Sequence, residues 1–447
     1  MIVRDEESLL SGCLESVRGA VDDIVVVDTG SRDATKAMAL AAGAKVVDFE
    51  WCDDFAAARN EALKYARGQW ILQLDADERL APGSAGPLRK AANNARFDCG
   101  MLRLHDATRV DSAPDAVISG RERQGEVQMV ARLLRRAPNL AYVDAIHENV
   151  LPWVVRRGKK IGPVDVDIIH LGATEHVVSS KKKIARNTLL LRRRIDRDPT
   201  DVVAYGYLAH DYLRSGSMDE ALAVTEAGWA HVALARKRNV SVHRLALARA
   251  YLYIPRRRFA ELRETMAYAR ELEGEHPDFS YAEAYSWELE SSALAGEARA
   301  DARRRARDGF LTCLGFRGTI FASAFVAGAS SWAALTRLGT LDLLEGNAVE
   351  AAREFDAALE LRPALREAML GRIETMIALG DPAGALRRVE PLLDGFPDTW
   401  TLAATAVEAL GRRADSAFFA KHAHTLLPKG FVAPHRRERL QALVGHS

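Results

Sequence analysis

Cysteine is scarce in this sequence of 447 residues, and the few cysteines show no pairing pattern. There are four of them, none in a CxxC spacing: Cys13, Cys52, Cys99 and Cys313. A disulfide framework is therefore excluded as the basis of the fold, and a reducing compartment is predicted. No signal peptide is visible, because charged residues begin at Arg4 and continue to Glu7. We expect a cytoplasmic protein.

An excess of charge of one sign is also absent. Lys and Arg together number 62 and Asp and Glu 61, which gives a formal net charge of +1. Short arginine clusters occur at 192–194, 256–258 and 303–305. Acidic residues balance these clusters, which predicts exposed helix faces rather than a nucleic-acid-binding surface. Nucleic acid is not expected as a partner.

Long hydrophobic runs suited to a membrane are missing. The longest uncharged stretch lies between Arg317 and Arg337 and is rich in Ala, Gly and Ser. A spanning helix would contain more Leu and Ile, so this stretch predicts a pair of buried helices. We expect no membrane span.

Apolar strands that end on acidic residues are the most informative feature present. Residues 70–74 form an apolar run that leads directly into Asp75 and Asp77. An upstream run at 24–27 ends on Asp28, and a Gly-Ser turn and a helix from about residue 34 follow. In parallel α/β domains ligands gather at the carboxyl ends of strands, where two carboxylates can hold a divalent cation. An isolated Asp-x-Asp pair is also typical of an ordinary acidic turn.

A third strand opens the chain at residues 1–3 and leads into the acidic segment 4–7 and a helix over 8–17. Three strand ends with acids, each followed by a helical pattern, predict half of a doubly wound nucleotide-binding sheet. The chain opens inside the first strand, so either this strand is short or the true start lies upstream of Met1.

Taken together, four segments resemble the start of a family 2 glycosyltransferase with the GT-A fold, in order and in spacing. The segments are residues 1–7, 27–31, 54–61 and 75–78. The resemblance implies that Asp28 reads the nucleotide base and that Glu6 lies beside the ribose. It also implies that Arg59 and Asn60 lie over the base or the diphosphate. Further nucleotide-sugar contacts are expected from Val3, Arg4, Asp75 and Ala76.

The same resemblance assigns a divalent metal, Mn²⁺ or Mg²⁺, to the Asp-x-Asp pair. Asp77 is expected to be a direct ligand, and Asp75 to touch the ribose or the metal. His170 ends an apolar strand at 167–170 and is expected to complete the metal shell, although a lone His at a strand end is more often structural. Lys183 and Arg186 follow on a helix, near the expected position of the diphosphate.

A second constellation lies at residues 131–135 and 142–148, where an Arg-containing strand precedes a His-Glu pair. The resemblance places this segment on the acceptor side. Glu148 is the candidate general base, because an inverting transfer needs a carboxylate opposite the leaving diphosphate. Asp144 is the reserve candidate, and the alternative is that His147 and Glu148 form only a solvated turn.

The chain changes character after about residue 196, where a period of 34 residues appears. Matching residues separated by this period are Gly346 and Gly380, Ala351 and Ala385, and Pro363 and Pro397. This is the tetratricopeptide period. Residues 205–221 fit the same pattern, and weaker copies are expected at 240–277 and 400–428. Such repeats often hold a peptide, but these helices could instead only stabilise the first domain or form a homodimer.

The sequence therefore predicts an α/β GT-A nucleotide-sugar-binding domain at 1–178, a connecting helix at 179–198, and an all-α tetratricopeptide-like solenoid at 199–447. The resemblance implies an inverting, metal-dependent transfer from a nucleotide diphosphate sugar, UDP-linked, to a peptide or protein side chain. A glycan or small-molecule acceptor and a non-catalytic repeat scaffold are the alternatives. A nucleotidyltransferase is disfavoured because no Gly-rich loop follows the first strand.

Overall fold

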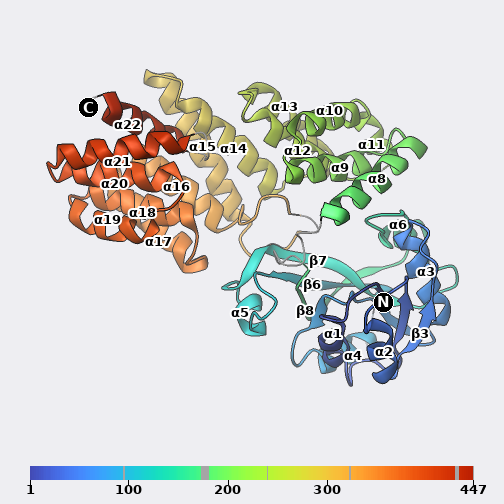
Figure 1. Ribbon diagram of the computed structural model, residues 1–447. Helices are drawn as coiled ribbons and strands as arrows, with labels where there is room; N and C mark the ends of the chain where they lie inside the picture. The colour runs from blue at the N-terminus through green and yellow to red at the C-terminus, as the bar shows by residue number, and fades with distance from the viewer. Residues whose placement is uncertain (94–95, 173–180, 239, 322–323, 428–431, 446–447) are drawn as a thin grey trace. The chain divides into compact units, whose positions relative to one another are not determined.

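The computed structural model describes the whole chain except residues 94–95, 173–180, 239, 322–323, 428–431 and 446–447 (Figure 1). The side chains of residues 181–183 are also outside the description. The chain divides into two compact units. The first contains residues 1–248 and 319–327, and the second contains residues 249–318 and 328–447.

A small parallel sheet opens the first unit. Its strands are β1 (Ile2–Val3), β2 (Val25–Asp28) and β3 (Lys45–Asp48), in that spatial order. Helices α1 (Leu10–Ser16) and α2 (Thr35–Ala41) connect them, as the sequence predicts. The middle strand is the most apolar, with Val26 and Val27 fully buried. Strand β3 is not predicted from the sequence, because its ends are charged and exposed.

A mixed sheet of five strands completes the α/β part, in the order β4-β7-β6-β8-β5. Its strands are β4 (Trp70–Leu72), β5 (Glu78–Leu80), β6 (Cys99–Ala107), β7 (Arg123–Arg135) and β8 (Ile161–His170). Leu74, Leu102, Leu133 and Ile168 form its buried core. The helices of this part are α3 (Phe55–Tyr65), α4 (Ala85–Asn93), α5 (Pro114–Ile118) and α6 (Leu151–Arg156). The predicted α/β class is thus confirmed.

Four helices after the sheets also belong to the first unit. They are α8 (Lys181–Arg197), α9 (Val202–Ser215), α10 (Met218–Trp229) and α11 (Val232–Arg238). The turn between α9 and α10 contains Gly216 at φ 78°, the left-handed conformation that ends many helices. Gly228 allows close packing, because a Cβ atom there would lie 2.6 Å from the Cβ of Tyr205.

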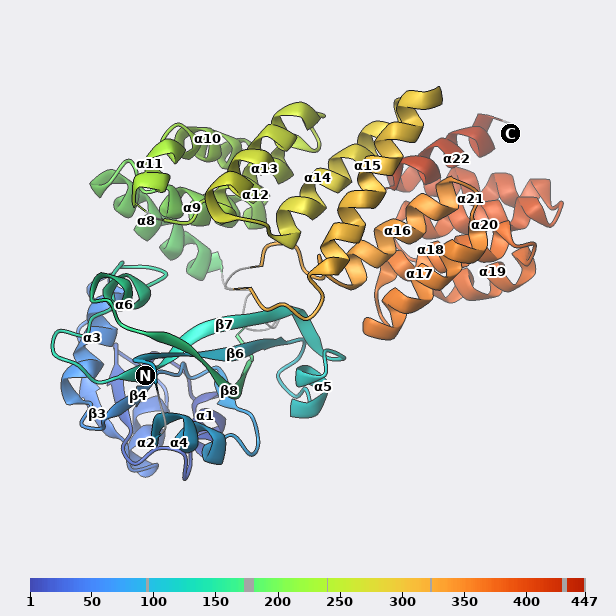
Figure 2. The ribbon, with the colours of Figure 1, turned by 180° about the vertical axis from the view of Figure 1, so that it is seen from behind.

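The rest of the chain is helical, in pairs that match the predicted repeats (Figure 2). After α12 (His243–Tyr253), within which the boundary between the units falls, the helices are α13 (Phe259–Glu273), α14 (Pro277–Ser291), α15 (Gly296–Gly315), α16 (Trp332–Leu344), α17 (Ala348–Leu361), α18 (Arg366–Ala378), α19 (Pro382–Val389), α20 (Pro397–Ala409), α21 (Arg413–Leu426) and α22 (Pro434–Gly445), with a 3₁₀ turn at Glu390–Leu392. The repeating glycines Gly346 and Gly380 both end helices at positive φ, 84° and 87°. The predicted helical repeat region is confirmed.

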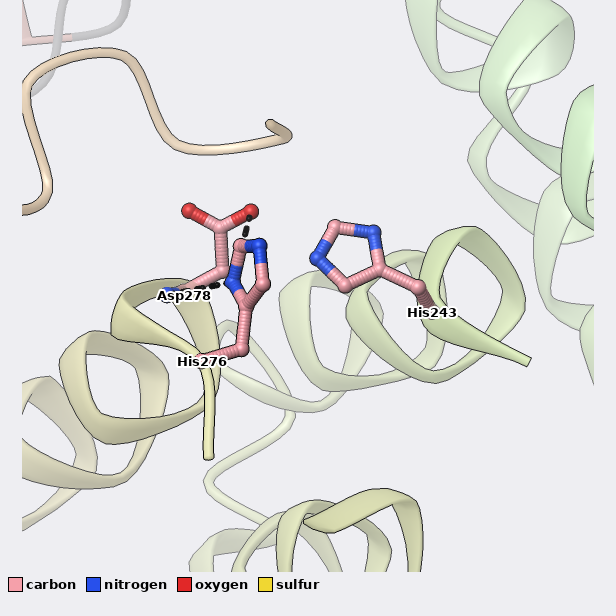
Figure 3. A group of neighbouring side chains, drawn as sticks. All are labelled: His243, His276 and Asp278. Carbon is pink, nitrogen blue, oxygen red and sulfur yellow. Dashed lines mark hydrogen bonds and ion pairs between the residues drawn. The ribbon is translucent and has the colours of Figure 1, made fainter. Parts of the chain in front are cut away.

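Helix α14 begins with a side-chain cap. The ring nitrogen Nδ1 of His276 accepts a hydrogen bond of 3.1 Å from the backbone N–H of Asp278 (Figure 3). Pro277 occupies the first helical turn, where its missing N–H costs no hydrogen bond. This histidine therefore defines the start of α14.

The expected pair of buried helices between Arg317 and Arg337 is not formed. In the part of this stretch that the structure describes, residues 318–331 contain turns and bends, and a single helix, α16, starts at Trp332. Glycine accounts for part of this, because Gly318 and Gly328 adopt positive φ. Among the described helices, none has the length and hydropathy needed to cross a bilayer.

Candidate functional site

Asp28, at the carboxyl end of β2, has one carboxylate oxygen bonded and one free. Its Oδ1 accepts hydrogen bonds of 2.9 Å from the backbone N–H groups of Gly30 and Ser31. Its Oδ2 is buried and has no hydrogen-bond partner in the described part of the chain. A buried acceptor without a partner is costly unless a ligand supplies the donor. The arrangement suits an N–H group such as the imide of uracil.

The other predicted residues of the first strand surround this turn. Val3 is buried, and its carbonyl accepts the backbone N–H of Thr29 at 3.0 Å. The backbone N–H of Glu6 donates to the Thr35 hydroxyl at 2.8 Å. Arg4 is exposed. These contacts connect the loop after β1 to the start of α2.

Arg59 of α3 connects two carboxylates that are distant in sequence. Its guanidinium binds Asp75 through two hydrogen bonds of 2.8 and 3.2 Å, and its Nε lies 2.5 Å from Glu148 Oε1. Burial alone would lower the pKa of Arg59, but Asp75 and Glu148 raise it well above its usual range. Burial would raise the pKa of Asp75, but Arg59 and Arg132 hold it well below its usual range. Both the arginine and Asp75 are therefore charged.

Arg132 and Glu78 extend this network, and the sequence analysis gave neither of them a role. The Arg132 guanidinium contacts Glu78 and lies 3.5 Å from Asp75. Glu78 also accepts the backbone N–H of Asp75 at 3.0 Å. The position of Glu78, directly after the Asp-x-Asp pair, was the available signal. These contacts fix the orientation of Asp75, whose neighbour Ala76 is buried.

Asn60 holds the start of the loop that carries Glu148. Its side-chain N–H donates to the Tyr142 carbonyl at 3.0 Å, and its oxygen accepts the Tyr142 backbone N–H at 2.8 Å. The sequence places these two residues far apart, so the contact was not foreseen. A contact between Asn60 and the donor remains a prediction.

The loop that carries Glu148 contains two non-glycine residues at positive φ, Asp144 at 74° and His147 at 53°. A backbone bridge between Val143 and Asn149 closes the loop. Asp144 lies 3.3 Å from Arg194 of α8, yet burial raises its pKa. The strained backbone turns Glu148 toward Arg59 and holds it at the site.

Helix α9 covers this loop through an aromatic stack. The rings of His147 and Tyr207 are nearly parallel, with centroids 3.6 Å apart. The Arg244 guanidinium lies 4.6 Å from the centre of the Tyr207 ring. Burial, with the charges of Arg244 and Arg194, lowers the pKa of His147 to about 3. The histidine is therefore neutral at physiological pH.

Asp77 and His170, the two residues predicted to bind the metal directly, lie close together where β8 ends beside the start of β5. Oδ2 of Asp77 lies 3.6 Å from Nε2 of His170, and Nδ1 of His170 lies 2.6 Å from Asp106. Burial opposes protonation of His170, but the hydrogen bonds to Asp106 and Asp77 raise its pKa to about 10. The imidazole thus lies between two carboxylates, which favour a positive charge on the ring.

Gly172 lies directly against this pair. A Cβ atom at position 172 would lie 2.1 Å from Asp77 Oδ2 and 2.6 Å from His170 Nε2. A side chain at position 172 would therefore overlap both predicted ligand atoms, and glycine allows them to keep these positions. Carboxylate oxygen with imidazole nitrogen is a donor set that suits Mn²⁺. The residues present fit a divalent cation.

The predicted basic residues of α8 lie at its start. Lys183 is within the helix, but its side chain is outside the described residues. The Arg186 guanidinium lies 4.9 Å from the centre of the Phe55 ring. Burial and the nearby charge of Arg4 lower the pKa of Arg186. Diphosphate contacts by Lys183 and Arg186 remain predictions.

Comparison with known proteins supports the identification of the first part of the chain. Residues 1–117 match the model of the family described as glycosyl transferase family 2. A protein named TPR repeat-containing protein Synpcc7942_0270, from Synechococcus elongatus, is 41% identical over 150 residues, which is 34% of each chain. The SPbeta prophage-derived glycosyltransferase SunS of Bacillus subtilis is 33% identical over 104 residues, or 22% of this chain and 25% of that protein.

This chain thus covers about a third or less of the length of these curated relatives. Among solved structures, a tetratricopeptide repeat protein from Parabacteroides merdae aligns with 59% of this chain and 93% of its own, at 16% identity and a TM-score of 0.42. At that score the likeness carries no weight here. The assignment of the repeats depends on the 34-residue period and on the observed helix pairs.

Proposed function

We propose that this chain, with its family 2 glycosyltransferase domain followed by tetratricopeptide-like repeats, transfers a sugar from a UDP-linked donor to a peptide or protein side chain. The observation that carries the proposal is the bridge formed by Arg59, which connects Asp75 of the Asp-x-Asp pair to Glu148. This bridge brings the candidate base next to the proposed donor and cation site. The unpartnered Oδ2 of Asp28 supports a uracil-containing donor.

In the proposed reaction, the bond between the anomeric carbon and the diphosphate oxygen breaks while the acceptor attacks from the opposite face. The acceptor proton goes to the Glu148 carboxylate, which forms an ion pair with Arg59. Asp77 and His170 would hold the cation, and a bound Mn²⁺ or Mg²⁺ supplies charge neutralisation of the leaving diphosphate. The product is an inverted glycoside.

A peptide or protein acceptor is proposed on the basis of the two-part architecture. Stacked helix pairs of this type present an extended surface suited to an unfolded segment. Helix α9 of the repeat-like region contacts the Glu148 loop through Tyr207 and His147. An acceptor bound on α9 would therefore lie beside the loop that carries the proposed base.

The proposal is tested by screening nucleotide sugars for hydrolysis and for transfer to peptides, with Mn²⁺ and with a chelator. We expect turnover of a UDP-sugar that requires the cation and is lost in Asp77→Ala. The matched control is Asp165→Ala, since this aspartate is 91% exposed and pairs only with Arg103 among the described contacts. Turnover that is equal in both variants, or equal with the chelator, would contradict the proposed site.

A further inference from the structure

Asp106, on β6, is the nearest partner of His170 outside the predicted site. The two residues are register partners on the parallel strands β6 and β8, so their side chains emerge on the same face of the sheet. Asp106 Oδ1 lies 2.6 Å from His170 Nδ1. Its second oxygen, Oδ2, accepts a hydrogen bond of 3.1 Å from the Gln128 side chain on β7. Both carboxylate oxygens are therefore engaged.

We propose that Asp106 is a positioning residue of the cation site and acts through His170, with Gln128 holding Asp106 in place. This inference rests on the proposed cation dependence. A carboxylate at Nδ1 keeps a ring proton on that nitrogen, so Nε2 is the nitrogen that binds a cation, and the cation displaces the proton that the imidazolium carries there. Nε2 is the atom that faces Asp77 Oδ2 at 3.6 Å and lies against Gly172.

The geometry explains why an outer carboxylate is needed. His170 is the last residue of β8, and the contact between its Nδ1 and Asp106 fixes the orientation of its ring. A ligand whose ring is fixed loses less conformational freedom when the cation binds. The hydrogen bond that the ring N–H at Nδ1 donates to Asp106 also makes Nε2 a stronger electron donor.

The same two strands contain a matched control on the opposite face of the sheet. His105 Nε2 lies 2.7 Å from Asp167 Oδ1, so β6 and β8 carry a second His–Asp pair that is unrelated to Asp77. Asp167 also binds Arg103 at 2.6 Å. Loss of Asp167 should therefore destabilise the sheet at least as much as loss of Asp106, without touching the cation site.

The test measures Mn²⁺ affinity of the full chain by calorimetry and by the electron paramagnetic resonance signal of free Mn²⁺, without donor. We expect Asp106→Asn to raise the Mn²⁺ dissociation constant about 10- to 100-fold, and Asp106→Ala to raise it at least as much. Gln128→Leu should give a smaller change in the same direction. Asp167→Asn should lower the melting temperature and leave Mn²⁺ affinity within twofold of the native value.

Two outcomes separate this inference from the proposed function. If Asp77→Ala loses Mn²⁺ but both Asp106 variants, folded by circular dichroism, bind it with native affinity, the role of Asp106 is overturned and the cation site stands. If the native chain and Asp77→Ala bind Mn²⁺ equally, the cation site itself fails, and the inference fails with it. An equal loss of affinity in Asp106→Asn and Asp167→Asn would show a general effect on the sheet and would also overturn the inference.

Discussion

The two oxygens of Asp28 have different environments, and this difference predicts how a substitution will act. Asp28→Asn keeps the oxygen that accepts the Gly30 and Ser31 N–H groups and replaces the unpartnered oxygen with an N–H₂ donor. A donor facing the imide N–H of uracil is repulsive, whereas N3 of cytosine accepts it. We expect UDP affinity to fall about 10-fold or more, as for a lost buried hydrogen bond of about 1 to 3 kcal/mol.

Calorimetry with UDP and CDP measures this change. CDP affinity should be unchanged or improved in Asp28→Asn, so each nucleotide serves as the control for the other. A native-like UDP affinity would mean that Asp28 does not read the base.

Glu148 is the second residue whose role can be isolated. Glu148→Gln retains an oxygen that can accept from Arg59 Nε, so the loop should keep its position. The amide cannot take a proton at neutral pH, and transfer should fall about 10² to 10⁴-fold with little change in donor affinity. Single-turnover assays measure transfer, and calorimetry measures donor binding. Loss of donor binding in this variant would instead assign Glu148 a structural role.

The loop from Tyr142 to Asn149 contains a histidine that should make the free energy of unfolding depend on pH. The folded-state pKa of His147, about 3, lies below its unfolded value of about 6.5. Between these two pKa values His147 is protonated in the unfolded chain and neutral in the folded chain. The free energy of unfolding should therefore fall as the pH drops below about 6.5. We expect the native melting temperature of the first unit to fall between pH 7.5 and pH 5.

Replacement of His147 by Asn checks this assignment. Asn tolerates the left-handed backbone at position 147 and does not titrate, although it loses the stack on Tyr207. Calorimetric melting should therefore show a lower stability at pH 7.5 and a smaller decrease toward pH 5 than in the native chain. An identical decrease in both proteins would exclude His147 as the titrating group.

Elements whose signal is local could be predicted from the sequence, whereas contacts set by strand pairing could not. The apolar runs that lead into Asp28 and Asp75 form strands where expected. Both signals, the apolar run and the turn residues after it, lie in neighbouring positions of the sequence. Asp77 and His170 meet as expected from the family resemblance. Asp106 was missed, because its contact with His170 depends on the register of β6 against β8. The contact between Arg59 and Glu148 likewise joins residues 89 positions apart.

At the scale of the whole chain, the first compact unit includes α9, α10 and α11, which lie in the region predicted from the sequence to be repeats. The predicted boundaries at 178 and 198 would place Tyr207 in a different domain from His147, on which its ring stacks. They would also separate Asp201 from Arg194, although the side chains of these two residues lie 2.6 Å apart. A fragment of residues 1–196 ends inside α8 and loses both contacts. A fragment of residues 1–248 retains them.

We therefore expect the shorter fragment to melt at a lower temperature than the longer one, and to expose apolar surface that binds a hydrophobic dye. Circular dichroism melting and dye fluorescence measure this difference. If both fragments are folded, both should hydrolyse the donor slowly. The predicted donor contacts and the predicted metal ligands, of which His170 is the last, all precede residue 196. Equal melting temperatures would mean that α9 contributes nothing to the sheet domain.

The close contact of Gly172 with Asp77 and His170 also predicts which other sequences of the same architecture keep a cation site. No Cβ atom fits there while Asp77 and His170 keep their positions. The smallest change, Gly to Ala, would force the Asp77 carboxylate to turn away, although every ligand residue is still present. A related chain that retains the Asp-x-Asp pair and the late histidine but has a side chain at this position should be suspected of having lost the cation. Glycine at 172 can thus mark intact sites in a way that the acidic motif alone cannot.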